Sequence, residues 1–190
     1  MEKDGSPSVV AESSHSKRAA AWHDKGAALG RVRRHKEALD VYDEATKLDP
    51  SDVESWLNKG IALINLDRYN EALYALDQAI VLDPKLAIAW EGKGNALIKL
   101  DRVHEALQAF DEAIGLDPSL ATAWFNKGIS LIKLGRHEEA VQAFDGAIRL
   151  DPRYASAWFN KGVSLMRLGR HEEAAQAFDE AAKLDRRYSA

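Results

Sequence analysis

The chain of 190 residues contains no cysteine, and this absence excludes several kinds of chemistry. Disulfide bonds, thiolate nucleophiles and zinc sites with cysteine ligands all need the missing residue. A chain without cysteine also fits a reducing compartment. We therefore expect a cytoplasmic protein.

Long hydrophobic runs and an excess of basic charge are also missing. The longest apolar run near the N-terminus, residues 9–11, is too short for a secretory signal, and no later stretch approaches a membrane span. The chain has 26 basic and 30 acidic residues, so its formal net charge is −4 and no general positive field attracts a phosphate backbone. We expect neither a membrane nor a nucleic-acid partner.

The sequence also lacks the residue patterns of active sites and metal sites. Two His-Glu-Glu triplets, which begin at His137 and His171, do not have the second histidine that a zinc-binding helix carries four residues later. No glycine-rich loop follows a strand pattern, and no nucleophile is paired with a base. We therefore expect no catalytic activity, no cofactor and no metal ion.

One pattern, by contrast, occurs five times at a spacing of 34 residues. In each copy a tryptophan is followed four residues later by a glycine, and the tryptophans are Trp22, Trp56, Trp90, Trp124 and Trp158. Units of this length are too small to fold alone and must stack on their neighbours. The expected organisation is a disordered tail at residues 1–18 and an array at 19–188, with repeats at 19–52, 53–86, 87–120, 121–154 and 155–188.

Each repeat contains two apolar clusters with the spacing of one helical face. In the fourth repeat these clusters are Trp124, Gly128 and Leu131, then Ala140, Phe144 and Ala147. A polar break with Gly135 separates them, and an Asp-Pro pair closes each of the first four repeats. Residues 51–54 have the form of a capping box that begins with Ser51. The sequence therefore predicts about ten helices of roughly 12 to 15 residues in antiparallel pairs, without strands.

A glycine in the middle of each first helix costs about 1 kcal/mol relative to alanine. We expect it to be compensated by close contact with a small residue of the second helix, such as Ala140 opposite Gly128. A lysine precedes each of these glycines, and each second helix carries an aspartate, for example Lys127 and Asp145. We expect some of these lysines and aspartates to form ion pairs within or between repeats.

These residues resemble the tetratricopeptide repeat family. The match comprises the tryptophan, the glycine, a large apolar residue, two alanines around an aromatic residue or leucine, and a closing proline, and it covers residues 19–188. The chain departs from the family by its lysine before the glycine and by Arg186 in place of the last proline. The resemblance implies an all-α fold, namely an α-solenoid in which helix-turn-helix repeats form a right-handed superhelix. It also implies a protein-binding scaffold whose concave groove holds a peptide or a partner helix.

The resemblance further implies that variable residues of the first helices line this groove. The candidate groove residues are Leu57, Asn58, Ile61, Asn95, Lys99, Phe125, Asn126, Ile129, Ile132, Lys133, Phe159, Asn160, Val163, Met166 and Arg167. A wider set adds His23, Asp24, Arg31, Glu54, Ile64, Asn65, Glu91 and Ile98. Apolar, amide and cationic groups in the second half suit a peptide with hydrophobic side chains and an acidic group. Phe125 and Phe159 have an alternative role, which is packing between repeats.

Two other functions stay open. The last repeat resembles an interior one, which favours a structural protein that forms homo-oligomers through its terminal repeats, as dimers or longer fibres, by end-to-end or tail-in-groove contacts. A reader of single-stranded RNA of the pentatricopeptide type is disfavoured, because the period is 34 residues and the expected groove is not basic.

Overall fold

The computed structural model describes residues 21–188, so the tail expected at residues 1–18 lies outside the described part. Within that part the secondary structure is helical and no residue belongs to a strand, which confirms the all-α fold class. The chain divides into two compact units, one up to Gly92 and one from Lys93, and the division falls inside a helix.

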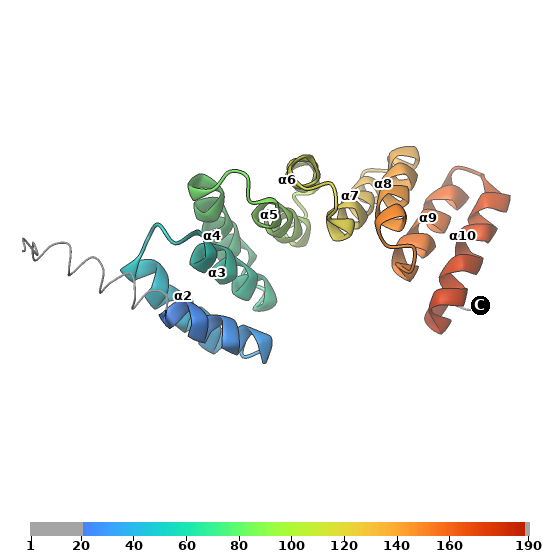
Figure 1. Ribbon diagram of the computed structural model, residues 1–190. Helices are drawn as coiled ribbons and strands as arrows, with labels where there is room; N and C mark the ends of the chain where they lie inside the picture. Colours follow the sequence, from blue (N-terminus) through green and yellow to red (C-terminus); the bar gives the residue numbers. More distant parts are fainter. Residues whose placement is uncertain (1–20, 189–190) are drawn as a thin grey trace, which may run out of the picture. The chain divides into compact units, whose positions relative to one another are not determined.

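The first unit consists of consecutive helices that run in alternating directions (Figure 1). A helix over residues 21–31 is followed by α2 (His35–Leu48), α3 (Val53–Asn65), α4 (Tyr69–Leu82) and the beginning of α5 (Ala87–Lys99). The apolar cluster of Ala79, Ile80 and Ala89 joins α4 to the helices on either side of it, because Trp56 and Leu57 of α3 and Trp90 of α5 pack against it.

The second unit repeats the same alternation. Its elements after α5 are α6 (Val103–Leu116), α7 (Ala121–Lys133), α8 (His137–Leu150), α9 (Ala155–Arg167), α10 (His171–Leu184) and the short 3-10 helix η1 (Arg186–Tyr188). Phe144 of α8 is fully buried in its main cluster, together with Leu131 of α7 and Ala157 of α9. In this unit α7 and α9 therefore each pack both on the second helix of their own repeat and on that of the preceding repeat.

A left-handed residue ends the first helix of every repeat, whether or not that residue is glycine. The φ angles are 59° at Arg33, 57° at Asp67 and Asp101, 70° at Gly135 and 74° at Gly169. At Gly135 the turn is closed by backbone hydrogen bonds from Gly135 N to Ile132 O and from Arg136 N to Leu131 O. The prediction that glycine suits this position is confirmed, and the first three repeats adopt the same turn with side chains that disfavour it.

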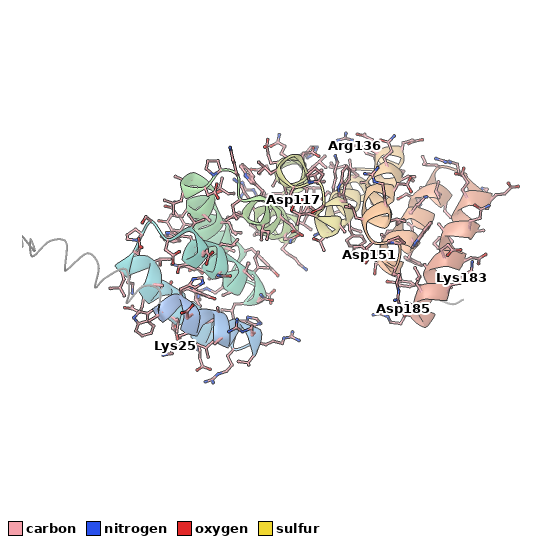
Figure 2. The ribbon with its side chains drawn as sticks, in the orientation of Figure 1. Lys25, Asp117, Arg136, Asp151, Lys183 and Asp185 are labelled. Carbon is pink, nitrogen blue, oxygen red and sulfur yellow. The ribbon has the colours of Figure 1, made fainter. Side chains whose placement is uncertain are left out.

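The aspartate before each proline shapes the loop that joins one repeat to the next. Asp117 Oδ1 accepts a hydrogen bond of 2.9 Å from the backbone N–H of Ser119, and Trp124 Nε1 donates one of 3.1 Å to the carbonyl oxygen of Pro118. Asp117 and Asp151 mark two of these loops in Figure 2. The hydrogen bonds from Ser119 also lower the pKa of the Asp117 carboxyl.

The predicted cap of α3 is wrong by one residue. Asp52, not Ser51, precedes the helix, and its side chain accepts a hydrogen bond from the N–H of Glu54 at 3.2 Å. Ser51 is directed toward the preceding loop instead: its backbone N–H and its hydroxyl both donate to Asp49 Oδ1, at 3.0 and 2.6 Å. The aspartate turn therefore decides which of two adjacent cap-forming residues is used.

The glycine that follows the repeated lysine in each first helix allows a close approach, as expected, but its nearest partner differs from the prediction. A Cβ atom added to Gly128 would lie 2.5 Å from Cε1 of Phe144, and one added to Gly60 would lie 2.6 Å from Cγ of Leu76. The large residue meets the glycine because long side chains on a helix lean back toward its N-terminus, so the Phe144 ring passes over Ala140. The glycine therefore accommodates a ring rather than an alanine.

The expected lysine–aspartate pairs form between successive repeats. Pairs with N–O distances of 2.7, 2.6 and 2.6 Å are Lys59–Asp43, Lys127–Asp111 and Lys161–Asp145. The same lysine ammonium lies over the tryptophan ring of its own repeat, at 4.9 Å for Lys59 and Trp56. These tryptophans are half-buried rather than fully buried. One side chain thus links the indole of one repeat to the carboxylate of the preceding one.

Candidate functional site

A cavity of about 400 Å³ lies between the first helix and α3 in the first unit. Its lining includes several residues of the predicted groove, namely Arg31, Asn58, Ile61 and Asn65. Ala27 and Gly30 complete the side formed by the first helix. They are the counterparts of Ile129 and Ile132 in the fourth repeat, and a Cβ atom on Gly30 would meet nothing within 4 Å. Two small residues therefore open this part of the groove.

The floor of this cavity is apolar and its rim is polar. Ala38 and Tyr42 of α2 are buried below it, and burial raises the pKa of the Tyr42 phenol while the charge of Arg31 opposes that shift. Asn65 Nδ2 donates a hydrogen bond of 2.9 Å to the carbonyl oxygen of Ile61. This bond uses the amide nitrogen, so the amide oxygen of Asn65 can still accept a hydrogen bond from a ligand. An aliphatic group fits the floor, and an acidic group beside it would meet the guanidinium of Arg31.

In the second unit two of the predicted amides meet directly. Asn126 Nδ2 of α7 donates to Asn95 Oδ1 of α5 at 2.9 Å, so these side chains join two successive first helices. Asn160 instead bonds to the carbonyl oxygen of Ser156 in its own helix, at 2.8 Å. Lys133 forms an ion pair of 3.1 Å with Asp101, which lies in the turn of the preceding repeat.

The predicted aromatic anchors pack on aromatic residues of their own repeats. The ring of Phe125 stacks on Tyr154 with centroids 4.9 Å apart and tilts against Phe144, and Phe159 stacks on Tyr188 at 4.8 Å. Phe125 and Phe159 are half-buried. Leu57 likewise packs against the cluster that joins α4 to its neighbours. These contacts are packing contacts, and each phenylalanine and its aromatic partners belong to one repeat.

The other predicted residues differ in exposure. Ile129 and Ile132 are half-buried against the main cluster of the second unit, and Val163 is half-buried on α9. The exposed members of the set are Ile61, Lys99, Lys133, Met166 and Arg167. The sequence favoured the second half for a peptide with hydrophobic side chains and an acidic group, whereas the cavity of Arg31, Asn58, Ile61 and Asn65 belongs to the first unit. In the sequence, this cavity could have been found from the small residues Ala27 and Gly30, which stand where the fourth repeat has isoleucines.

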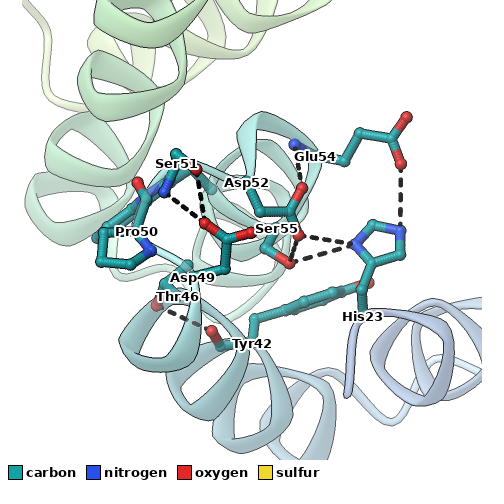
Figure 3. Close-up of polar contacts among 10 residues, drawn as sticks. His23, Tyr42, Thr46, Asp49, Pro50, Ser51, Asp52, Glu54 and Ser55 are labelled. Carbon is teal, nitrogen blue, oxygen red and sulfur yellow. Dashed lines mark hydrogen bonds and ion pairs between the residues drawn. The ribbon is translucent and has the colours of Figure 1, made fainter. Parts of the chain in front are cut away.

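A polar cluster joins the first helix to the start of α3 (Figure 3). Ser55 is fully buried and its hydroxyl donates to Asp52 Oδ2 at 2.5 Å. His23 Nδ1 lies 3.3 Å from the same hydroxyl, and its Nε2 lies 3.4 Å from Glu54 Oε2. His23 and Glu54 belong to the wider predicted groove, whereas Ser55 was not predicted. His23 occupies the position of Phe125, so the two units connect their repeats in different ways.

Within residues 21–188, no group of three histidine, aspartate or glutamate side chains is arranged to hold a metal ion. None of the helices in the same range is both long and apolar enough to cross a bilayer.

Comparison with known proteins agrees with this architecture. Two structures of MamA are similar to the chain: one has a TM-score of 0.80 at 26% identity and covers 88% of this chain and 92% of that one. The other, residues 41 to the end of MamA from Desulfovibrio magneticus RS-1, has a TM-score of 0.81 at 25% identity, over 91% and 98%. YrrB, described as a protein of the same repeat class with an unusual peptide-binding site, has a TM-score of 0.73 at 26% identity, over 86% and 84%.

The curated protein sequences contain no significant match. The family model for the tetratricopeptide repeat, however, matches four overlapping segments, residues 23–87, 68–121, 91–155 and 125–189. These segments span the described residues almost completely and agree with the repeated helix pairs. The chain belongs to the tetratricopeptide repeat family.

Proposed function

We propose that this protein is an interaction scaffold that binds an extended peptide along the first helices of its repeats. The observation that carries the proposal is the cavity between the first helix and α3, because predicted groove residues line it and two small residues open it. The preferred peptide places an aliphatic side chain on the floor of this cavity and a carboxylate near Arg31. YrrB, which is similar in fold, is described as having a peptide-binding site.

Amide groups support the same proposal, because they suit a peptide backbone. Asn58 lines the cavity in the first unit, and Asn126 occupies the equivalent position of α7. The carboxamide of Asn126 is held by Asn95. A side chain held in one orientation loses less conformational entropy when a peptide binds. We assign each asparagine to the backbone of a peptide bound within its own unit, and the cavity of the first unit to one side chain of the peptide bound there.

Selection of peptides from a random display library on the full chain tests the proposal. The selected peptides are then measured against Gly30→Ile, which fills the cavity, and against Gly115→Ala as a control on the exposed side of α6. We expect at least about tenfold weaker binding to Gly30→Ile and unchanged binding to the control. Equal affinity for all three proteins, or a selection without any binding peptide, contradicts the proposal.

Self-association is a second candidate function, and the lysine–aspartate pairs favour it. Lys25 lies over Trp22 at 4.9 Å, in the same arrangement as Lys59 over Trp56. Among the described residues Lys25 pairs with no aspartate, and Asp179, the counterpart of Asp145, pairs with no lysine. Both side chains are exposed. A second copy that stacks its first repeat on α10 would complete this pair.

The apolar surfaces around the two residues are also uncovered. Ala21 is exposed, whereas its counterpart Ala157 is fully buried, and Ala175 is exposed where Val141 is 6% exposed. The second copy would therefore use the contacts that already join one repeat to the next. Because alanine replaces valine on α10, this association is expected to be weaker than the contact inside the chain.

Exchange of the two charges tests self-association. Lys25→Asp and Asp179→Lys should each remain monomeric in sedimentation experiments, because like charges then meet at the contact. An equimolar mixture of the two variants should associate again, because each then offers the charge that the other lacks. The controls Lys85→Asp and Glu112→Lys make the same charge changes elsewhere and should behave as the wild type. A wild type that stays monomeric up to millimolar concentration contradicts self-association.

A further inference from the structure

A second cavity, of about 590 Å³, lies between α7 and α8 in the fourth repeat. Trp124, Ala143 and Gly146 form its apolar part, and Lys127 and Arg149 contribute positive charge at its rim. Successive residues of a helix are rotated by about 100°, so Trp124 and Asn126 project from nearly opposite sides of α7. This cavity is therefore separate from the proposed groove.

The fourth repeat differs from the others at the glycine of this cavity. The other repeats carry an acid or an amide at the same position, namely Glu44, Gln78, Glu112 and Glu180. A Cβ atom on Gly146 would lie 2.6 Å from Cε3 of Trp124, so the indole lies directly against the backbone of α8. Only glycine permits this contact, which combines the indole, the backbone at Gly146 and the buried Ala143 into one apolar surface.

Because position 146 is a glycine, Arg149 lacks the carboxylate that pairs with the corresponding lysine in the first and last repeats. In the first and last repeats a lysine pairs with the acid three residues earlier: Lys47 with Glu44 at 2.8 Å and Lys183 with Glu180 at 2.6 Å. Arg149 occupies the lysine position in the fourth repeat, but Gly146 supplies no carboxylate. Arg149 is exposed, and among residues 21–188 it forms no ion pair and no side-chain hydrogen bond.

The carboxylates at the rim of the cavity are already bound by other residues. Glu139 accepts hydrogen bonds from Arg136, which lower the pKa of its carboxyl, and Asp145 pairs with Lys161 at 2.6 Å. Lys127 is paired as well, with Asp111. Each negative charge at the rim therefore has a basic partner, and the charge of Arg149 remains for a ligand.

We infer that this cavity binds an acidic peptide segment. An aliphatic or aromatic side chain of the peptide lies on Trp124 and Gly146, and a neighbouring carboxylate takes the place of the acid that the fourth repeat lacks, opposite Arg149. Arginine and carboxylate form charge-assisted, frequently bidentate hydrogen bonds, which supply the specificity. This site is independent of the groove, so the protein can hold two segments at once.

An NMR titration of the isotope-labelled full chain tests the site with two small probes. The acidic probe is acetyl-Leu-Glu-amide, and the matched neutral probe is acetyl-Leu-Gln-amide. We expect saturable shifts of the backbone amide signals of Gly146 and Arg149 with the acidic probe, and binding at least about tenfold weaker with the neutral one. Equal shifts with both probes, or no saturable shift at millimolar concentration, overturn the inference.

Substitutions then separate the site from general charge effects. Arg149→Glu should abolish the response, whereas Arg153→Glu, an exposed residue of the next loop, makes the same charge change and should preserve it. Arg149→Lys should keep part of the affinity, because the charge remains and the bidentate geometry is lost. Peptides selected for the groove should still bind Arg149→Glu. An Arg149→Glu protein that is folded by circular dichroism and still binds the acidic probe overturns the inference.

Discussion

The first and second units connect their repeats at the same position with different chemistry. In the first unit His23 reaches a polar cluster of Ser55, Asp52 and Glu54 at the start of α3. In the second unit Phe125 occupies that position and stacks on Tyr154 before α9. The helix pairs are the same in both units, although one connection is polar and the other is aromatic. The repeat therefore accepts different residue types at the position of His23 and Phe125.

The groove differs between the units in a related way. Ala27 and Gly30 leave a cavity in the first unit, whereas Ile129 and Ile132 fill the corresponding positions of the fourth repeat and pack against its core. The first unit thus offers space for a ligand, and the second unit uses the same positions for its own packing. Four sets of substitutions test the contacts that hold the helices together in the two units, in order of decreasing expected effect.

Removal of the aromatic stack should have the largest effect. Phe125→Ala loses contacts with Tyr154 and Phe144 and should lower the free energy of unfolding by roughly 2–3 kcal/mol, because the ring is half-buried. The equivalent change in the first unit, His23→Ala, should cost less, about 1 kcal/mol, because it removes polar contacts and one tilted ring contact with Tyr42 at 6.1 Å. Urea unfolding of both variants measures the difference. Equal losses would show that the two connections are energetically alike.

The close approach of glycine to a ring should come second. Gly128→Ala brings a Cβ atom against the buried Phe144 ring and should cost about 1–3 kcal/mol despite the better helix propensity of alanine. Gly115→Ala is the matched control, because a Cβ atom there meets nothing within 4 Å, and it should stabilise by about 0.5–1 kcal/mol. Thermal unfolding of both variants measures the size and the sign of each change in stability. A stabilising Gly128→Ala would mean that the ring moves aside freely.

The turns within repeats should give an effect of about 1 kcal/mol with opposite signs in the two units. Arg33→Gly relieves a left-handed residue in the first unit and should stabilise by about that amount, whereas Gly135→Ala creates the same strain in the second unit and should destabilise equally. Asp67→Gly should gain less, because the Asp67 carboxylate also accepts a hydrogen bond from Tyr69. Unfolding midpoints of the three variants provide the measurement.

The smallest difference between the units is expected in their response to acid. Glu37 in the first unit and Glu139 in the second each accept hydrogen bonds from the arginine three residues earlier, which lower the pKa of both carboxyls. The stabilisation is present above the unfolded glutamate pKa of about 4.3 and is lost as the pH falls through the lower folded value. Arg34→Gln and Arg136→Gln should therefore reduce the acid dependence of stability equally. A larger change for either variant would break this equivalence.

Much of the scaffold could be predicted because it depends on local and periodic signals. Tryptophan, glycine and alanine at fixed spacings identify the helix pairs, and Lys59–Asp43 is one of the ion pairs that the repeated charges predict. The partner of Gly128 was predicted wrongly, because the Phe144 side chain leans back along its own helix and its ring becomes the nearest neighbour of the glycine. The cap of α3 was misplaced for a similar reason, since Asp49 engages Ser51.

The candidate sites were harder to predict, because they depend on residues that are small or missing. Gly30 and Gly146 carry no side chain to suggest a ligand, and their effect appears only when the space around them is known. Phe125 is a typical anchor by residue type, but its ring is already stacked on Tyr154. Comparison of each position across the repeats would have shown both glycines as exceptions.

Four of the five indoles donate a hydrogen bond to the carbonyl of the preceding proline, and these bonds give the junctions between repeats their own optical reporters. The bonds are Trp56 to Pro50, Trp90 to Pro84, Trp124 to Pro118 and Trp158 to Pro152. Opening of one junction would expose one half-buried ring to water and alter its fluorescence. The fluorescence of variants that retain a single tryptophan would therefore reveal the order in which the junctions between repeats open during unfolding.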